Sequence, residues 1–301
     1  LVLKMVFDEP VGEYFLDLTA KGISKGTSGK FAVIGGSPQY TGAPYYAAYT
    51  PLKIGADLSY VYTHPDAATV IKGYSPDLIV HPGHGWESIK ERLDYFDGLV
   101  FGPGLGRDPI LYPLLKQLLQ EVRERTDRLS MVIDADGLFL VQKDLSMLTG
   151  CSNVILTPNH REFDRLWDAV FPSKLQDEKT SENVKKVARH LGVCICRKGS
   201  SDIISDGEHV IECQTDGSPR RCGGQGDLLS GAVVCFSHWA GLRFKDAAVN
   251  PKIKLLRGAY TASRFIRYTA FAAYRDQGRS MTATDMIANL GNAVRHFEPK
   301  L

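Results

Sequence analysis

The sequence lacks any apolar run of about 18 residues, the length that a membrane-spanning helix requires. It also lacks an excess of one charge: 36 Lys and Arg residues stand against 34 Asp and Glu residues, a formal net charge of +2. This balance argues against nucleic acid or an anionic membrane as the main partner. The chain starts at Leu1 with neither an initiator Met nor a cleavable signal pattern, so we expect a processed or trimmed terminus.

Cysteine pairs with metal-ligand spacing are missing as well. Of the six cysteines, Cys194 and Cys196 are close in sequence, and their spacing places both on one face of a strand. The cysteines lie mostly in apolar runs, so we expect a reduced, intracellular protein. We place it in the cytoplasm and leave a mitochondrial address open. The composition permits a homo-oligomer without requiring one.

The two common glycine motifs for nucleotides are also absent. The Rossmann fingerprint needs a glycine at the position of Leu229. The nearest approach to a P-loop is Gly29-Lys30, but Phe31 stands where a Ser or Thr should bind magnesium. A nucleotide must therefore bind in another way, if one binds.

The chain does have a glycine-rich stretch at 220–231, in which Gly223, Gly224 and Gly226 precede Asp227 and an apolar run. Glycines let the backbone turn sharply, and the apolar run predicts a buried helix. Because a helix start presents N–H groups and the positive end of its dipole, the stretch predicts an anion site. Asp227 then stands where a carboxylate could take a proton from a hydroxyl group. A reading in which Asp227 only caps the helix stays open.

Short apolar runs alternate with amphipathic stretches along the chain. This alternation predicts a mostly parallel central sheet with helices on both faces. With 301 residues and 44% hydrophobic content, we expect one domain over 1–301, with 1–29 as an N-terminal extension. The expected strands are 31–34, 57–62, 78–81, 98–101, 131–133, 153–156 and 193–197. The expected helices are one ending near 54, then 86–93, 109–124, 137–141, 161–169, 182–191, one after 227, 247–274 and 282–296, with a loop at 172–180.

Polar and glycine-rich residues gather just after these strands. Gly102, Gly104 and Gly106 follow one strand, and Asp134 and Asp136 follow the next. Since the carboxyl ends of parallel strands meet at one edge of a sheet, we expect a shared ligand crevice there. The turn at 35–41 could line it too. For Asp136, a helix cap is the favoured interpretation.

Asn159 and Glu162 lie three residues apart at the start of a predicted helix, beside His160. Both side chains could point at one spot, where they would hold a hydrated magnesium ion or order phosphate waters. A capping box uses similar spacing and is the rival interpretation. Lys198 ends a later strand and could reach a phosphate. Beyond it, Asp206-Gly207 between apolar runs predicts a hairpin of strands 203–205 and 209–213, a short antiparallel edge.

Together these stretches resemble known proteins. Residues 223–227 are similar to the anion hole and catalytic aspartate of ribokinase-like kinases, and Asn159-x-x-Glu162 is similar to their second motif. More narrowly, 102–106, 134–138, 157–163, 198–202 and 223–231 occur in the order typical of the eukaryotic-type, ATP-dependent NAD(P)H-hydrate dehydratases. The resemblance covers about 29–298 and implies a ribokinase-like three-layer α/β/α fold.

The resemblance also implies a repair reaction. ATP would phosphorylate the ring hydroxyl of hydrated NADH or NADPH, (S)-NADHX or NADPHX, and loss of phosphate would restore the reduced cofactor. Mg²⁺ would accompany ATP, with Glu162 in contact through water, and Asp227 would be the catalytic residue and touch the substrate. An NAD(P)H-hydrate epimerase on a separate chain would be the functional partner.

The resemblance assigns further residues to the two ligands. ATP binding is implied for Lys198, Gly199, Ser200, Ser201, Asp202, Gly217, Ser218, Pro219, Arg220, Arg221, Cys222, Gly223, Gly224, Gln225 and Gly226. Contact with the hydrated dinucleotide is implied for Gly104, Gly106, Asn159, His160, Arg161, Glu162, Phe163, Asp164 and Arg165.

Two other functions stay open. A small-molecule kinase for a vitamin or sugar alcohol would share the anion hole and Asp227, but would release a stable phosphate ester. A nucleotide sensor without chemistry would be expected to have replaced Asp227, which is present here.

Overall fold

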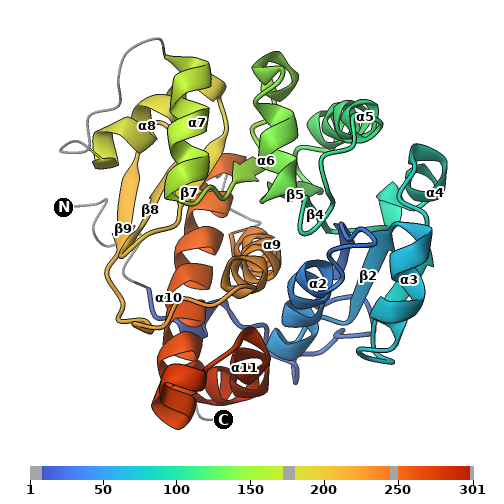
Figure 1. The fold of residues 1–301 in the computed structure, drawn as a ribbon. Coiled ribbons are helices and arrows are strands. Elements are labelled where there is room, and N and C mark those ends of the chain that lie inside the picture. The colour runs from blue at the N-terminus through green and yellow to red at the C-terminus, as the bar shows by residue number, and fades with distance from the viewer. Residues whose placement is uncertain (1–8, 172–179, 245–249, 299–301) are drawn as a thin grey trace.

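The computed structural model of the chain describes residues 9–171, 180–244 and 250–298. Within them the centre is a nine-stranded sheet with the order β3-β2-β1-β4-β5-β6-β7-β8-β9 (Figure 1). Neighbours from β3 to β7 are parallel, and β8 and β9 add antiparallel pairs at one edge. The predicted sheet and its edge are confirmed. The strands are β1 Lys30–Ile34, β2 Leu58–Thr63, β3 Ile79–Pro82, β4 Gly98–Phe101, β5 Ser130–Ile133, β6 Val154–Leu156, β7 Cys194–Arg197, β8 Asp202–Ser205 and β9 Val210–Cys213.

Helices cover both faces of the sheet, and two hydrophobic cores lie between the layers. Side chains alternate between the faces: Cys194 and Cys196 enter one core and Ile195 the other, as the strand pattern predicts. One face is covered by α2 Gly42–Ile54, α3 Pro65–Lys72, α9 Gln225–Arg243, α10 Pro251–Gln277 and α11 Ala283–Phe297. The other is covered by α4 Trp86–Lys90, α5 Leu111–Glu124, α6 Asp136–Val141, α7 His160–Val170 and α8 Thr180–Leu191.

Helix α9 lies between α2 and α10 (Figure 1). It is apolar around most of its circumference, and its residues from Leu228 to Ser237 are all buried. Since such a helix has no polar face for solvent, it belongs in the middle of a layer. Because the rest of α9 is buried between the neighbouring helices, the position of its first turn is fixed relative to the sheet.

The described part of the N-terminal extension packs against this helical layer. A 3₁₀ helix, η1, spans Val11–Tyr14, and the ring of Phe15 contacts Phe236 and Trp239. The indole N–H of Trp239 donates to the carbonyl oxygen of Ser28 at 2.8 Å. The extension therefore covers α9 and contributes to the core.

Some predicted elements differ from the structure. Helix α3 escaped prediction because its eight residues include β-branched side chains and an exposed Val70. Its N-cap is His64, whose Nδ1 accepts from the Asp66 N–H. The helix predicted at 86–93 is split into α4 and the 3₁₀ helix Leu93–Tyr95. Most of the predicted loop at 172–180 and the predicted start of the helix at 247 lie outside the described residues.

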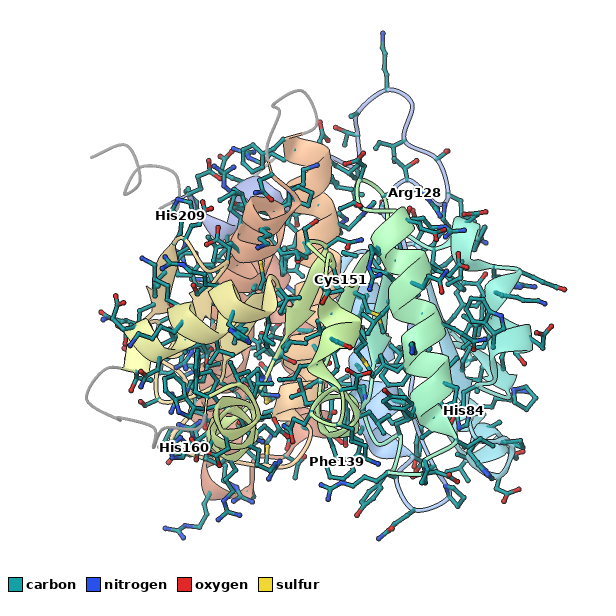
Figure 2. The ribbon with its side chains drawn as sticks, turned by 90° about the horizontal axis from the view of Figure 1, so that it is seen from above. His84, Arg128, Phe139, Cys151, His160 and His209 are labelled. Atoms are coloured by element: carbon teal, nitrogen blue, oxygen red, sulfur yellow. The ribbon has the colours of Figure 1, made fainter. Side chains whose placement is uncertain are left out.

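The two ends of the sheet carry different groups. Figure 2 places Phe139 and His160, which follow the carboxyl ends of β5 and β6, near one edge, and Arg128, which precedes β5, at the opposite edge. Across 9–171, 180–244 and 250–298, no helix combines the length and apolarity needed to cross a bilayer.

Candidate active site

The first turn of α9 forms the predicted anion site. The helix begins at Gln225 after its N-cap Gly224, whose φ of 94° is left-handed. A Cβ on Gly224 would lie 2.7 Å from the Cβ of Ala283 and 2.8 Å from Cδ2 of Tyr46, so only glycine fits. Among the described residues no side chain caps α9. The N–H groups of its first turn are therefore suited to bind an anion.

Asp227 lies inside this first turn, so the interpretation in which it caps the helix is wrong. Burial, and after it the negative charge of Asp134, raises the pKa of Asp227 to about 7, while the Lys198 ammonium acts in the opposite direction. A carboxylate with a pKa near 7 is a stronger base than an ordinary aspartate and is still largely ionised just above neutral pH. The site therefore holds a base beside an anion-binding backbone.

Lys198, which follows β7, is paired with Asp134, which follows β5. Its Nζ donates to Oδ1 of Asp134 at 2.6 Å, and Asp134 is 1% exposed. Burial opposes the charge of Lys198, but the negative charges of Asp134 and Glu162 raise the pKa of Lys198 above its usual value. The ammonium is therefore charged and fixed near Asp227.

The interpretation of Asp136 as a helix cap is wrong. The N-cap of α6 is Ala135, and Asp136 is the first helical residue. Its carboxylate instead accepts from the Gly106 N–H at 3.0 Å and lies 3.3 Å from Nε of Arg107. The chain turns at Ala135, whose φ is 49°, so the Asp136 side chain points at the neighbouring glycine loop rather than at its own helix.

Asn159 and Glu162 do form the capping box. The Asn159 side chain accepts from the Glu162 N–H at 3.0 Å, and the Asn159 N–H donates to Oε2 of Glu162 at 2.8 Å. Burial raises the pKa of Glu162, with the Asp134 charge adding to it and Lys198 opposing it. The box explains the spacing, and it also fixes the carboxylate close to the Lys198–Asp134 pair.

A cavity of about 880 Å³ opens beside the first turn of α9. Among the predicted ATP residues, Ser201 and Arg220 lie outside its lining: Ser201 donates to Glu212, and Arg220 to the Arg221 carbonyl. The other predicted ATP residues line it, namely Lys198, Gly199, Ser200, Asp202, Gly217, Ser218, Pro219, Arg221, Cys222, Gly223, Gly224, Gln225 and Gly226.

The residues predicted to contact the dinucleotide are more scattered. Asn159 and His160 line the same cavity, but Phe163 is 1% exposed, its ring lies in a hydrophobic core, and it can offer a ligand little beyond its backbone. Gly104 lies against Tyr40, and its carbonyl accepts from Ser37. On α7, Arg161 and Arg165 are exposed and Asp164 lies 3.6 Å from Nδ1 of His160.

Sequence reasoning missed Arg267 on α10. Its guanidinium makes a bidentate ion pair with Asp202, at 2.8 and 2.9 Å, and donates to the carbonyls of Gly199 and Ser200 at 2.9 and 2.6 Å. It therefore holds the strand-end loop that lines the cavity. Ser263, Ile266 and Ala270 share this helix face and line the cavity too, at a spacing visible in the sequence. Which face of α10 meets the site depends on the fold.

The architecture is that of the ribokinase-like fold. A ribokinase-like superfamily protein from Enterococcus faecalis matches with a TM-score of 0.76 at 21% identity, over 96% of this chain and 94% of that one. An ADP/ATP-dependent NAD(P)H-hydrate dehydratase from Bacillus subtilis, co-crystallised with ATP/Mg²⁺, matches with a TM-score of 0.73 at 20% identity, over 95% and 96%. The predicted fold class is confirmed.

The sequence comparisons identify one family within this fold. A family model described as NAD(P)H-hydrate dehydratase matches residues 31–290. The ATP-dependent (S)-NAD(P)H-hydrate dehydratase of Rattus norvegicus is 44% identical over 89% of this chain and 79% of its own length. That of Vitis vinifera is 42% identical over 91% and 83%. This chain belongs to the NAD(P)H-hydrate dehydratase family, as its motifs predict.

Proposed function

We propose that this chain catalyses the ATP-dependent dehydration of (S)-hydrated NADH and NADPH, which restores the reduced cofactor and releases ADP and phosphate. The observation that carries the proposal is Asp227, a base with a pKa of about 7 in the first turn of a helix that no described side chain caps. Family membership supplies the substrate, since relatives more than 40% identical bear this name.

The reaction begins with transfer of a phosphoryl group. Asp227 accepts the proton of the ring hydroxyl while the hydroxyl oxygen forms a bond to the terminal phosphorus of ATP. The bond between that phosphorus and the ADP oxygen breaks. The N–H groups at the start of α9 and the Lys198 ammonium balance the charge on the transferred group. Phosphate then leaves with the electron pair of its carbon–oxygen bond. The neighbouring ring carbon gives its proton to water, and the electron pair of that carbon–hydrogen bond restores the ring double bond.

The charge and oxygen ligands of the site fit magnesium that arrives with ATP. No group of three His, Cys, Asp or Glu side chains that could hold a metal occurs in 9–171, 180–244 and 250–298. We therefore propose that ATP oxygens and water bind Mg²⁺, with Glu162 in contact through water. When bound, the ion neutralises phosphate charge.

Hydrated NADPH, ATP and Mg²⁺ mixed with the protein test the proposal. We expect reduced-nicotinamide absorbance and free phosphate to rise together, and neither to rise without ATP. ATP consumption with another alcohol, leaving a stable phosphate ester, would replace the dehydratase by a kinase. Binding of ATP without turnover of any substrate would favour a sensor.

We also propose the biological setting that the family suggests. An epimerase on a separate chain would convert the other hydrate isomer, so that adding it should raise the fraction of a mixed hydrate that this protein repairs. A cytoplasmic location, with a mitochondrial one as the alternative, is checked by cell fractionation. Light scattering during gel filtration gives the oligomeric state.

A further inference from the structure

Asp134 is held rigidly at the carboxyl end of β5. Its N–H donates to the carbonyl of Phe101 at 3.0 Å, and its carbonyl accepts from the Gly137 N–H at 2.9 Å. The next residue, Ala135, has a φ of 49°, the one positive value at a non-glycine among the described residues. A residue held in this region costs free energy and persists where its surroundings fix it. The backbone that carries Asp134 is therefore fixed on both sides.

The partner of Asp134 lies against the anion site. The Lys198 N–H is bonded to the Pro158 carbonyl at 2.8 Å, which fixes the base of that side chain. A Cβ built on Gly226 would lie 3.2 Å from Nζ of Lys198 and 4.0 Å from Oδ2 of Asp134. The ammonium and the carboxylate therefore both reach the first turn of α9.

This placement is costly for Lys198 alone. The start of a helix carries a partial positive charge, which repels an ammonium group. Desolvation adds to the cost, since only 18% of the Lys198 side chain is exposed. Asp134, whose side chain is 2% exposed, offsets both effects through its 2.6 Å contact. Without it, Lys198 would be expected to turn toward solvent.

We propose that Asp134 is a positioning residue that holds the Lys198 ammonium beside Gly226, where it contacts the terminal phosphates of ATP. The proposal rests on the proposed function, because phosphoryl transfer at Asp227 places those phosphates at this turn. An ammonium has three N–H donors, so it can bond Asp134 and a phosphate oxygen together. AMP lacks these phosphates, so its binding does not depend on the Lys198–Asp134 pair.

The difference between the two nucleotides gives the experiment. Calorimetry measures the binding of AMP and of AMP-PNP, an ATP analogue that resists hydrolysis, to wild type, Asp134→Asn, Lys198→Met and the double variant. We expect Asp134→Asn to weaken AMP-PNP binding about tenfold or more, the loss of one charged hydrogen bond, and to leave AMP binding within about twofold. The double variant should bind AMP-PNP as weakly as Lys198→Met, because Asp134 acts through Lys198.

Two results would overturn the proposal. An equal loss of AMP and AMP-PNP affinity would show that Asp134 only supports the fold. If the loss of AMP-PNP affinity in the double variant equals the product of the losses in the two single variants, Asp134 does not act through Lys198. If Asp134→Asn does not fold, Asp134→Glu keeps the charge but displaces it by one methylene, and unchanged AMP-PNP affinity there would count equally against positioning. Binding needs no hydrated dinucleotide, so failure of the proposed function would appear separately, in the turnover assay.

Discussion

At the scale of single residues, the site concentrates charge that would cost stability elsewhere. Burial and the charge of Asp134 raise the pKa of Asp227 to about 7. Between about pH 4 and pH 7 the folded protein therefore binds a proton that the unfolded chain does not bind. The free energy of unfolding falls as the pH rises through this window. Asp227 is thus a base kept at the expense of stability.

We predict that Asp227→Asn separates these two effects. Turnover should fall about 100-fold or more, since general-base catalysis contributes on this scale. The melting temperature at about pH 8 should rise above that of wild type, because the amide removes the buried charge, and the gain should vanish below about pH 3, where the wild-type carboxyl is protonated in both states. Calorimetry and the turnover assay measure both quantities.

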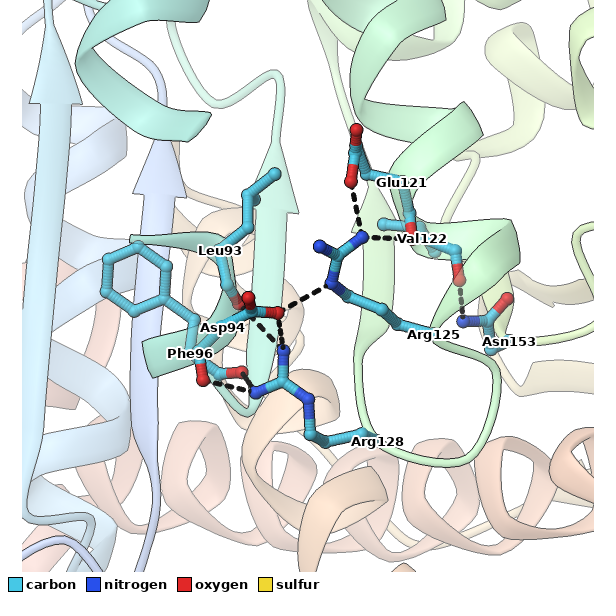
Figure 3. A network of polar contacts seen from close by, with 8 residues as sticks. All are labelled: Leu93, Asp94, Phe96, Glu121, Val122, Arg125, Arg128 and Asn153. Atoms are coloured by element: carbon cyan, nitrogen blue, oxygen red, sulfur yellow. Dashed lines mark hydrogen bonds and ion pairs between the residues drawn. The ribbon is translucent and has the colours of Figure 1, made fainter. Parts of the chain in front are cut away.

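Asp94→Asn is the matched control for turnover, because this exposed aspartate bonds Arg125 and Arg128 at the amino ends of the strands (Figure 3). Its turnover should equal that of wild type. Full activity in a folded Asp227→Asn variant would show that another group takes the proton.

Asp227 also leads to a prediction about the pH dependence of wild-type activity. As a base that must be ionised, Asp227 should give kcat/KM an acid limb centred near pH 7, with activity lost as the pH falls. A limb near pH 4, the ordinary aspartate value, would show that Asp227 is not perturbed in the free enzyme.

At the scale of elements, the start of α9 depends on the backbone of one glycine. We predict that Gly224→Ala destabilises the protein by about 1–3 kcal/mol, because φ is 94° and a methyl group would collide with Ala283 and Tyr46. ATP binding should fall with it, since the first turn would shift. Gly223→Ala is the control: a Cβ there meets no described atom within 4 Å, so its melting temperature should stay unchanged. Equal melting temperatures for the two variants would contradict the steric argument.

Arg267 joins α10 to the cavity loop, and a lysine cannot replace its fork of donors. We predict that Arg267→Lys raises KM for ATP about tenfold while kcat changes less, since Asp202 and the carbonyls of Gly199 and Ser200 lose their bidentate partner. Arg275→Lys, an exposed change on the same helix, should leave both constants unchanged. A loss confined to kcat would place Arg267 at the chemistry rather than at the loop.

Sequence reasoning found the elements whose signals are local. The strands, the hairpin at Asp206-Gly207 and the helix after the glycine stretch follow from apolar patterns and turn residues, and the structure confirms them. The pairing of Lys198 with Asp134 could not be found this way, because the two residues follow β7 and β5, which lie on either side of β6 in the sheet and are far apart in the chain. The site assignments of single residues carry over from motifs and stay predictions until ligands are tested.

At the scale of the whole molecule, the sheet separates function from stability. The cavity beside the first turn of α9 lies at the carboxyl ends of the parallel strands. At their amino ends Arg125 and Arg128 both bond Asp94, while Asn153 donates to Val122 (Figure 3). This second network ties the segment before β4 to the segment before β5. Within the described residues, none of its hydrogen bonds or ion pairs reaches a residue that lines the cavity, so we expect it to act on stability alone.

We therefore predict that Arg128→Ala lowers the free energy of unfolding by about 1–2 kcal/mol, since its guanidinium donates to the carbonyls of Leu93, Asp94 and Phe96. The melting temperature should fall by about 2–6 °C. Turnover well below that temperature should equal wild type, because Arg128 is not among the groups whose charge shifts the pKa of Asp227. Lys186→Ala, an exposed change on α8, controls for the loss of one positive charge. A drop in kcat for Arg128→Ala would show that the amino ends of the strands also set the geometry of the site.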